Sequence, residues 1–372
     1  MYARTKLRAT AIAGTIAAAA LTLWLVLPRE RLLTDVGHQI TTVPAEVEES
    51  IWLSNHELLM VYTDHPAWVT IKGSRITIDR WQGHAMVFDT VATKMSPQPV
   101  LSAQLNNSLD KKGGTSPHSF RVSPGGAWLV WDVGTWKEDR QPISYAARID
   151  GTQHRQLERA QNENSFFIDD RHYVQVSESE PYLAIRSFET PKLDREYIKF
   201  EQANAELKRL AAQQPTFLAE PVLDDENHRV ELRTYRTEDR LQKLYTDIRD
   251  YIGDPDPVST VILKLPAGAQ CDAAYISRQQ NLICYHLVVT RTDPLAALHH
   301  RAVPQFPVQS RRTEALWVSG IDGSSFHEVG HVPVKPADAM KSDILSEIAW
   351  LPGSKQISFR NSGNLYVVPA DK

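Results

Sequence analysis

Cysteine is the scarcest chemically informative residue in this sequence, with two among 372 residues. A disulfide-dense scaffold is therefore excluded. The 17 Gly and 22 Pro residues follow no collagen-like period, and 42% of the residues are hydrophobic, too many for a disordered chain. The composition is that of a globular protein with enough material for a large core.

Several catalytic motifs are also absent from the sequence. It contains no Gly-x-Ser-x-Gly elbow, which excludes the hydrolase domain that carries this motif. It contains neither a Walker motif nor a dinucleotide-binding fingerprint. We expect no cofactor and no resident metal.

The charge of the chain is unevenly distributed. The formal net charge is −4, but residues 1–31 carry five basic residues and one acidic residue, so the remainder is strongly acidic. Nucleic-acid-binding domains present basic surfaces. The sequence therefore predicts no nucleic-acid partner.

The first apolar segment is residues 9–27, which contain no charged residue. Nineteen residues at about 1.5 Å each just span a bilayer core of about 30 Å. Three basic residues precede the segment, which predicts a cytoplasmic tail over residues 1–8 and an extracytoplasmic remainder. We interpret 9–27 as an uncleaved transmembrane signal anchor. A cleaved signal peptide is the alternative, although no small-x-small site follows the segment.

The rest of the chain repeats a short pattern: an apolar strand, a turn, and a second strand that often ends in an aromatic residue. Pro and Gly in such turns favour β-hairpins. The pattern occurs at 122–131, 350–359, 52–62, 167–176, 275–285 and, weakly, 222–230.

A second element follows several of these hairpins. Residues 144–151 and 315–323 are alternating strands closed by an Asp-Gly turn, and 86–89 is a shorter version. Four strands per unit at a spacing of about 45 to 75 residues are typical of a β-propeller. The sequence predicts an all-β propeller of about six blades, with a range of six to seven.

These motifs resemble the TolB-type β-propeller repeat, in which a Trp-Ser-Pro-Asp-Gly hairpin precedes a Tyr-rich strand ending in Asp-Gly. The specific motifs cover residues 120–157 and 315–368. The sequence departs from the consensus, with Ser-Pro-Gly-Gly at 123–126 and Leu-Pro-Gly-Ser at 351–354. The resemblance implies the fold; it does not imply a ligand.

The two ends of this predicted domain, residues 39–372, are expected to pair. The last unit ends after its third strand, 365–368, so its fourth strand must come from elsewhere. Propellers often close their ring with a strand from the other terminus. We expect residues 39–43 to supply this strand, leaving 28–38 as a linker from the anchor.

Two stretches interrupt the strand pattern. Residues 199–212 and 237–252 have apolar residues at helical spacing, and Thr237 and Gly253 are suited to begin and end the second helix. We expect two helical insertions. They either pack on the ring as structural filler or form a knob that binds a partner.

Three long connections, 63–84, 132–143 and 289–314, are predicted on one face of the ring because each joins the second and third strands of a unit. Loops on a rigid scaffold often carry recognition. The alternative is that these loops are solvated and bind nothing. The candidate binding residues are Trp136, Lys137, Arg140, His299, His300, Arg301, Arg311 and Arg312.

The segment His327–His331 matches the zinc-peptidase motif His-Glu-x-x-His. That chemistry requires both His side chains on one turn of a helix. Here Asp322–Val329 aligns with Asp150–Leu157 of the earlier repeat, which predicts a β-strand. Residues i and i+4 of a strand lie about 13 Å apart, too far for one zinc ion. We therefore reject the zinc site.

The cysteines, Cys271 and Cys284, flank one predicted hairpin. A turn centred on Gln279 and Gln280 places Cys284 opposite Tyr275 rather than opposite Cys271. The register therefore favours two partly buried thiols over a disulfide.

The leading hypothesis is a single-pass membrane protein whose extracytoplasmic propeller, periplasmic in a Gram-negative cell, is a non-catalytic module that binds or scaffolds a protein partner. The alternative is an enzyme, a hydrolase or lyase, whose site in the central channel is built from several blades. Such a site leaves little local sequence signal.

Overall fold

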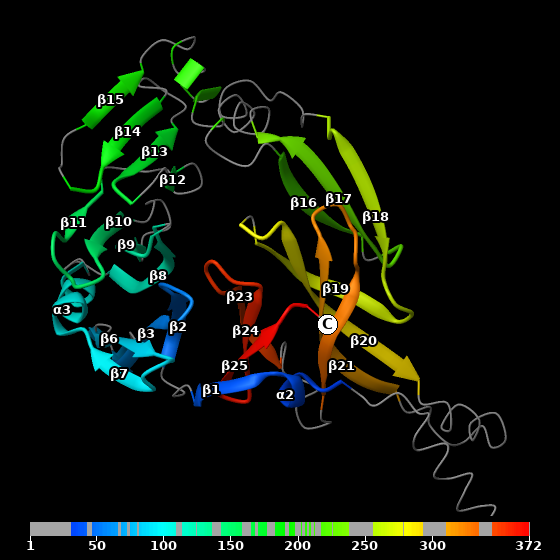
Figure 1. Ribbon diagram of the computed structural model, residues 1–372. Helices are drawn as coiled ribbons and strands as arrows, with labels where there is room; N and C mark the ends of the chain where they lie inside the picture. The colour runs from blue at the N-terminus through cyan, green and yellow to red at the C-terminus, as the bar shows by residue number, and fades with distance from the viewer. Residues whose placement is uncertain are drawn as a thin grey trace, which may run out of the picture.

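The computed structural model is built mostly from antiparallel β-sheets that follow one another in chain order around a ring (Figure 1). Five sheets have four strands, one has three, and β4 and β5 form a separate two-stranded ribbon. The structure describes residues 31–42, 47–65, 68–72, 75–79, 82–108, 114–123, 125–135, 143–157, 165–167, 170–176, 183–189, 193–197, 202, 205–206, 208–209, 212, 217–224, 226–237, 256–277, 279–292, 310–334 and 344–371.

We number the sheets in chain order. The first contains β2 (Val47–Trp52), β3 (Glu57–His65), β6 (Gln82–Asp89) and β7 (Lys94–Pro97), and its ribbon contains β4 (Trp68–Lys72) and β5 (Arg75–Asp79). The second contains β8 (Gly114–Val122), β9 (Trp128–Thr135), β10 (Ile143–Arg148) and β11 (Arg155–Gln156). The third contains β12 (Ser165–Phe167), β13 (His172–Val176), β14 (Leu183–Ser187) and β15 (Leu193–Tyr197).

The remaining sheets complete the ring. The fourth contains β16 (Phe217–Asp224), β17 (Arg229–Arg236) and β18 (Ser259–Lys264). The fifth contains β19 (Ala269–Ser277), β20 (Leu282–Thr292), β21 (Ser310–Gly320) and β22 (His327–Pro333). The sixth contains β23 (Leu345–Trp350), β24 (Gln356–Asn361), β25 (Asn364–Pro369) and β1 (His38–Thr42).

All six hairpins predicted from the sequence are present, one in each sheet. Where both faces of a sheet are packed, as in the second and fifth sheets, the central strand has a nearly continuous apolar sequence. On β9, Leu129 and Trp131 pack against the first sheet, whereas Trp128 and Val130 pack against the third. The β-pattern in the sequence therefore marks the strands that lie between two neighbouring sheets.

The repeated Asp-Gly turns are equivalent in structure. Gly151 and Gly323 have φ angles of +81° and +77°, a conformation that glycine adopts without strain. Before each glycine, the aspartate accepts hydrogen bonds at Oδ1 from the N–H and hydroxyl groups two residues later, for Asp150 at 2.9 and 2.6 Å and for Asp322 at 3.0 and 2.6 Å. The sequence alignment of these repeats is therefore confirmed.

Apolar clusters join neighbouring sheets. One cluster joins the first and second sheets, and others join the second to the third, the fourth to the fifth, and the fifth to the sixth. A further cluster joins the sixth sheet to the first through Leu365 and Val367 on one side and Leu58 and Met60 on the other. These clusters and the return of the sixth sheet to the first are typical of a β-propeller, and the predicted all-β class is confirmed.

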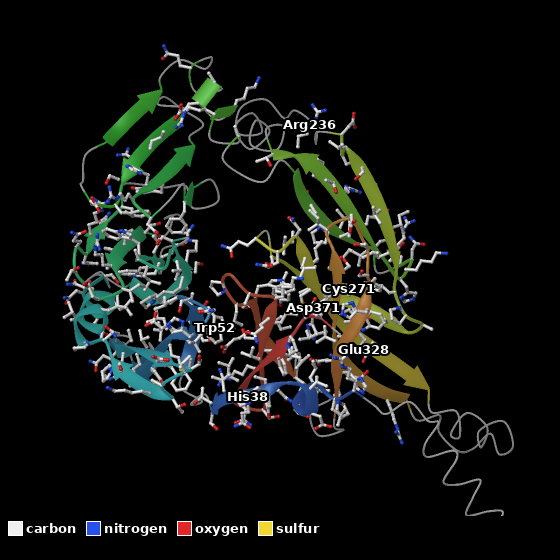
Figure 2. All side chains as sticks on the ribbon, viewed as in Figure 1. His38, Trp52, Arg236, Cys271, Glu328 and Asp371 are labelled. Carbon is white, nitrogen blue, oxygen red and sulfur yellow. The ribbon has the colours of Figure 1, made fainter. Side chains whose placement is uncertain are left out.

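The ring closes as the sequence predicts. Strand β1 pairs antiparallel with β25, with Gln39 opposite Tyr366. On the other side of the closure lies Trp52, at the end of β2 (Figure 2). Its Nε1 donates to Ser358 Oγ at 2.8 Å. Glu347 on β23 accepts hydrogen bonds from Ser50 of the first sheet and from Arg360 of its own sheet. Residues from both ends of the chain therefore join the sixth sheet to the first.

The expectation of a linker over 28–38 is wrong for its described part. Helix α2 (Leu33–Val36) follows residue 32, and Leu33 is fully buried between the fifth and sixth sheets. The N–H of His331 donates to the Arg31 carbonyl at 3.0 Å, so the segment also pairs with β22. Burial of a leucine against two sheets outweighs the freedom of a linker.

The predicted anchor, residues 9–27, lies outside the described residues. Among the residues that the structure describes, no helix is long and apolar enough to cross a membrane.

The two predicted helical insertions fall only partly within the described residues, and one helix was not predicted. Within 199–212 the residues described as helical are 202, 205, 206, 208 and 209. Of the second insertion, only Thr237 falls within the described residues. Helix α3 (Pro99–Ser108) was not predicted; it buries Leu101 and Leu105 between the first and second sheets.

The fourth sheet differs from the others in the position of its hairpin turn. The turns of the fifth and sixth sheets lie together, because the Gly353 N–H donates to Gln279 Oε1 at 2.9 Å. The turn after β16 instead places His228 Nδ1 3.0 Å from the carbonyl oxygen of Ala269, at the opposite end of β19. A nine-residue strand is about 26 Å long. The hairpin turn at the weak repeat, 222–230, therefore lies at the opposite end of the sheets from the hairpin turn of the fifth sheet.

Candidate binding face

A two-stranded stem extends from the fifth sheet at the end of the ring opposite its hairpin turn. Strand β19 pairs with β20 as far as Val289, and β22 pairs with β21 as far as Thr313. Strands β20 and β21 continue past both, with Arg291 opposite Arg311 and Thr292 opposite Ser310. This stem brings arginines from both strands to one end of the molecule.

The first sheet carries a similar extension. Strand β2 pairs with β3 as far as Tyr62, and β7 pairs with β6 as far as Met86. Strands β3 and β6 continue to the pair of His65 and Gln82, and the ribbon of β4 and β5 follows. We call this extension and the stem of the fifth sheet together the stem face, defined by residues 63–65, 68–72, 75–79, 82, 290–292 and 310–312.

The expectation of three long loops is therefore wrong for two of them in their described parts. Residues 63–84 are largely strand, and strands occupy both ends of 289–314. Within 132–143 the strands extend to Thr135 and resume at Ile143. Added cross-strand hydrogen bonds satisfy backbone groups that a loop would leave to water.

The candidate residues separate into two groups. Arg311 and Arg312 lie on β21, in the stem, rather than in a loop; Arg311 is exposed and Arg312 is half-buried. The other six lie outside the described residues: Trp136, Lys137, Arg140, His299, His300 and Arg301. Their expected place beside the stem remains a prediction.

A buried polar network lies at the base of the stem. Glu314 is fully buried, and Arg312 Nη2 lies 3.5 Å from its Oε1. Glu314 Oε2 accepts hydrogen bonds from the backbone N–H groups of Ile344 and Leu345 at 2.9 and 2.8 Å. The carboxylate therefore ties the fifth sheet to the first residues of the sixth.

His286 extends this network to the surface. Its Nε2 lies 3.3 Å from Glu314 Oε2 and its Nδ1 lies 3.3 Å from Asp272 Oδ2. The imidazole is buried, whereas the Asp272 side chain is half exposed. His286 therefore links the buried Glu314 to Asp272 at the surface.

The pKa of the Glu314 carboxyl reflects two opposing influences. Burial alone would raise this pKa, but the hydrogen bonds from His286 and from the Leu345 and Ile344 N–H groups hold it below its ordinary value of 4.5. Glu314 is therefore an ionised tether between two sheets.

The His-Glu-x-x-His segment lies on β22, which confirms that it is not a zinc-peptidase helix. His331 Nδ1 lies 2.7 Å from Glu328 Oε1, and His327 Nε2 lies 2.9 Å from the Ala370 carbonyl oxygen. Among the described residues, no group of three His, Cys, Asp or Glu side chains is placed to hold a metal ion.

The two cysteines adopt the predicted register, with Cys284 opposite Tyr275 and Cys271 opposite Leu287. Both thiols are free and buried. Burial, together with the nearby Cys271, raises the pKa of the Cys284 thiol. The Cys284 thiol is therefore not an activated nucleophile.

Sequence reasoning missed the network of Glu314 and His286. A signal was present in the sequence. Glu314 directly precedes the apolar residues Ala315–Val318 of the same strand, and His286 lies inside the apolar run of β20. A charged residue inside a strand buried on both faces requires a partner. Which partner it finds depends on the packing of two sheets.

The chain matches no protein-family model and no curated protein sequence. Among solved structures it is similar to the AtxE2 isopeptidase without ligand, with a TM-score of 0.40 and 10% identity over 90% of this chain and 51% of that chain. It is also similar to a putative TolB from Agrobacterium tumefaciens, with a TM-score of 0.33 and 8% identity over 82% of this chain and 87% of that one.

A third similar structure is an oligogalacturonate lyase in complex with manganese, with a TM-score of 0.33 and 10% identity over 90% of this chain and 96% of that one. The chain spans about half the length of the isopeptidase chain. Because the identities and the TM-scores are low, these similarities assign neither an activity nor a partner.

Proposed function

We propose that this chain is a membrane-anchored β-propeller that binds a protein partner and does no chemistry of its own. In this proposal the six sheets are six blades, and residues 9–27 cross the membrane once. The N-terminal tail, residues 1–8, is cytoplasmic, and the propeller lies outside the cytoplasm.

The observation that supports the binding role is the stem of the fifth sheet. It projects past its four-stranded sheet and carries the exposed Arg311 on an otherwise acidic body, while the half-buried Arg312 lies against Glu314 at its base. The Glu314 tether fixes this base, so Arg311 is presented by a rigid element. Rigid presentation lowers the entropy cost of binding, and positive charge steers an acidic partner toward this face.

In this proposal, the position of β1 limits how far the ring can lie from the membrane. Its first residue, His38, is eleven residues beyond the end of the predicted anchor, and residues 31–36 are already held against the fifth and sixth sheets. A short tether keeps the ring close to the bilayer surface. The partner is therefore either a membrane protein or a protein that approaches the membrane.

Affinity purification of the full-length chain from its native membranes in mild detergent tests the binding role. We expect one protein to co-purify in stoichiometric amounts with the wild-type chain and to be lost with Arg311→Glu. The matched control is Lys355→Glu, a charge reversal on the exposed turn after β23, which should retain the partner. Equal loss in both variants, or no stoichiometric partner, contradicts the proposal.

Reporter fusions at the C-terminus test the topology. Alkaline phosphatase, which is active only outside the cytoplasm, should be active when fused after residue 372, and a cytoplasmic reporter should be silent. The reverse pattern contradicts the orientation.

A further inference from the structure

The fourth sheet lacks the strand that completes each of the others. In the other five sheets the third strand pairs with a fourth, which is β7, β11, β15, β22 or β1. Among the described residues, the third strand of the fourth sheet, β18, pairs with β17 alone. One side of β18 is therefore an open edge, and it lies on the outside of the ring (Figure 1).

The hydrogen-bond pattern shows which backbone groups line this edge. The N–H of Leu265 donates to the His228 carbonyl at 3.1 Å, so the odd-numbered residues of β18 direct their backbone groups toward β17. The backbone groups of Thr260, Ile262 and Lys264 alternate with these and point toward the open edge. Backbone groups exposed in this way are a template for another strand.

The fourth strands of the other sheets carry features that prevent such pairing. Strand β11 has two residues, β15 has three charged residues among five, and β7 begins with a lysine and ends with a proline. Register shifts interrupt the pairing of β1 with β25 and that of β22 with β21. Short length, charge, proline and bulges are the common protection of sheet edges.

Strand β18 has none of these features at its centre. Val261–Leu263 are three successive apolar residues, and the one charged residue of the strand is its last, Lys264. The pairing of β18 with β17 has no register shift. The side chain of Ile262 is 51% exposed, so apolar area remains to be buried there.

We propose that the occupant of this edge is β18 of a second copy of this chain, paired antiparallel around a two-fold axis at Ile262. In this register Ile262 lies opposite its own copy and Val261 lies opposite Leu263, so all three central positions pair apolar with apolar. A register shifted by two residues places Ile262 opposite Thr260 or Lys264, and a shift by one exchanges the two faces.

The symmetry of the strand itself identifies the occupant. A two-fold axis brings the same surface of both copies together, so the apolar centre of β18 has to match itself. Val261–Leu263 does so, and the two Lys264 side chains lie at opposite ends of the pair. The edge is separate from the stem face and from the predicted anchor. The inference therefore stands whether or not the stem binds a protein.

Disulfide trapping on the full-length chain in mild detergent tests the register. Opposite residues of a hydrogen-bonded antiparallel pair have Cα atoms about 5.5 Å apart, which suits a disulfide. We expect Ile262→Cys to give a covalent dimer on mild oxidation, seen on a non-reducing gel. Lys264→Cys is the matched control on the same strand, because its two copies lie four positions apart, about 13 Å. It should run as a monomer, as should the wild type, whose cysteines are buried.

A second measurement tests the association without added cysteines. Light scattering corrected for detergent should give two chains per particle for the wild type and for Ile262→Val. Ile262→Lys places like charges opposite one another at the axis and should give one chain per particle at the same concentration. This variant should fold, because the side chain is half exposed. One wild-type chain per particle, equal trapping at positions 262 and 264, or a dimer that persists in Ile262→Lys would overturn the proposal.

Discussion

The fourth and fifth sheets are neighbours, yet they are stabilised differently. The fifth sheet is buried on both faces: Tyr285 and Leu287 pack against the fourth sheet, while Cys284 and Leu316 pack against the sixth. The fourth sheet buries one face, through Val230 and Leu232.

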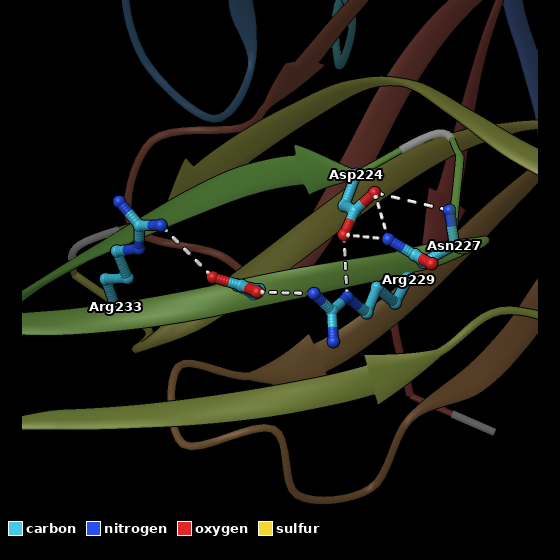
Figure 3. Close-up of polar contacts among 5 residues, drawn as sticks. Asp224, Asn227, Arg229 and Arg233 are labelled. Carbon is cyan, nitrogen blue, oxygen red and sulfur yellow. Dashed lines mark hydrogen bonds and ion pairs between the residues drawn. The ribbon is translucent and has the colours of Figure 1, made fainter.

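The opposite face of the fourth sheet carries a row of charges (Figure 3). Arg229 Nε lies 2.7 Å from Asp224 Oδ2, and Glu231 bridges Arg229 and Arg233 at 3.2 and 3.1 Å. Hydrogen bonds from the side chains of Asn227 and Arg229 lower the pKa of Asp224. The exposed fraction of the Arg229 and Arg233 side chains is 35% and 37%, so water competes for these contacts.

The two sheets differ in what stabilises their faces: apolar burial on both faces of the fifth sheet, and ion pairs on one face of the fourth. Burial of apolar area contributes about 25 cal/mol per Å², whereas exposed ion pairs contribute little. We expect the fifth sheet to be a rigid centre of the ring and the charged face of the fourth sheet to be energetically neutral. Four substitutions test this difference, in order of decreasing effect.

The largest effect is expected from Tyr285→Ala in the fifth sheet. Tyr285 is fully buried and its hydroxyl lies 3.0 Å from Ser319 Oγ. Removal of a buried aromatic ring leaves a cavity and should lower the free energy of unfolding by about 3–5 kcal/mol. Urea denaturation measures the change. A loss below about 1 kcal/mol would contradict the rigid centre.

Glu314→Gln should cost less, about 2 kcal/mol, because the amide oxygen still accepts backbone hydrogen bonds while the charge facing His286 and Arg312 is lost. The pKa of Glu314 is depressed in the folded protein. Its contribution is therefore complete above the unfolded carboxyl pKa near 4.5 and is lost as the pH falls from there through the folded value. Urea denaturation between pH 7 and about pH 3 should show a steeper loss in wild type than in the variant; parallel curves contradict the tether.

Gly323→Ala tests the contact between the two sheets. Gly323 has φ +77°, and a Cβ atom there would lie 2.6 Å from Val261 Cγ1 of the fourth sheet. A left-handed conformation costs a residue other than glycine about 1–2 kcal/mol, and the flexible valine can move. We expect a loss of about that size in urea denaturation. Gly353→Ala is the control, because its φ is similar but nothing lies within 4 Å of the new Cβ atom; it should lose no more than Gly323→Ala does.

The smallest effect is expected from Glu231→Gln, which removes the centre of the charged row. Exposed ion pairs are weakened by water and salt, so the urea midpoint should not change measurably. The same titration in high salt should give the same midpoint for wild type and variant. A large loss would show that the charged face is covered by another part of the ring.

Much of the fold was predictable because turns and strands follow from the identities of residues that are close together in the sequence. The Asp-Gly turns at 150–151 and 322–323 and the apolar strands beside them depend on backbone conformation and period-two alternation. The same local patterns placed His327 on a strand and Cys284 opposite Tyr275.

The candidate site was less predictable. The sequence predicted Arg311 and Arg312 in a loop, whereas both lie on β21, because strand length beyond the sheet depends on cross-strand pairing. Helix α3 was missed because Leu101 and Leu105 have a weak helical pattern and are stabilised by two sheets.

The sequence by itself therefore determined the all-β class, the hairpins, the closing strand and the alternation of charge along β17, since each follows from the conformational preferences of neighbouring residues. Only the tertiary structure decided that Glu314 meets the backbone of residues 344–345 and that Leu33 belongs to the core. Each of these joins residues that are distant in the chain, and their burial makes the contact strong.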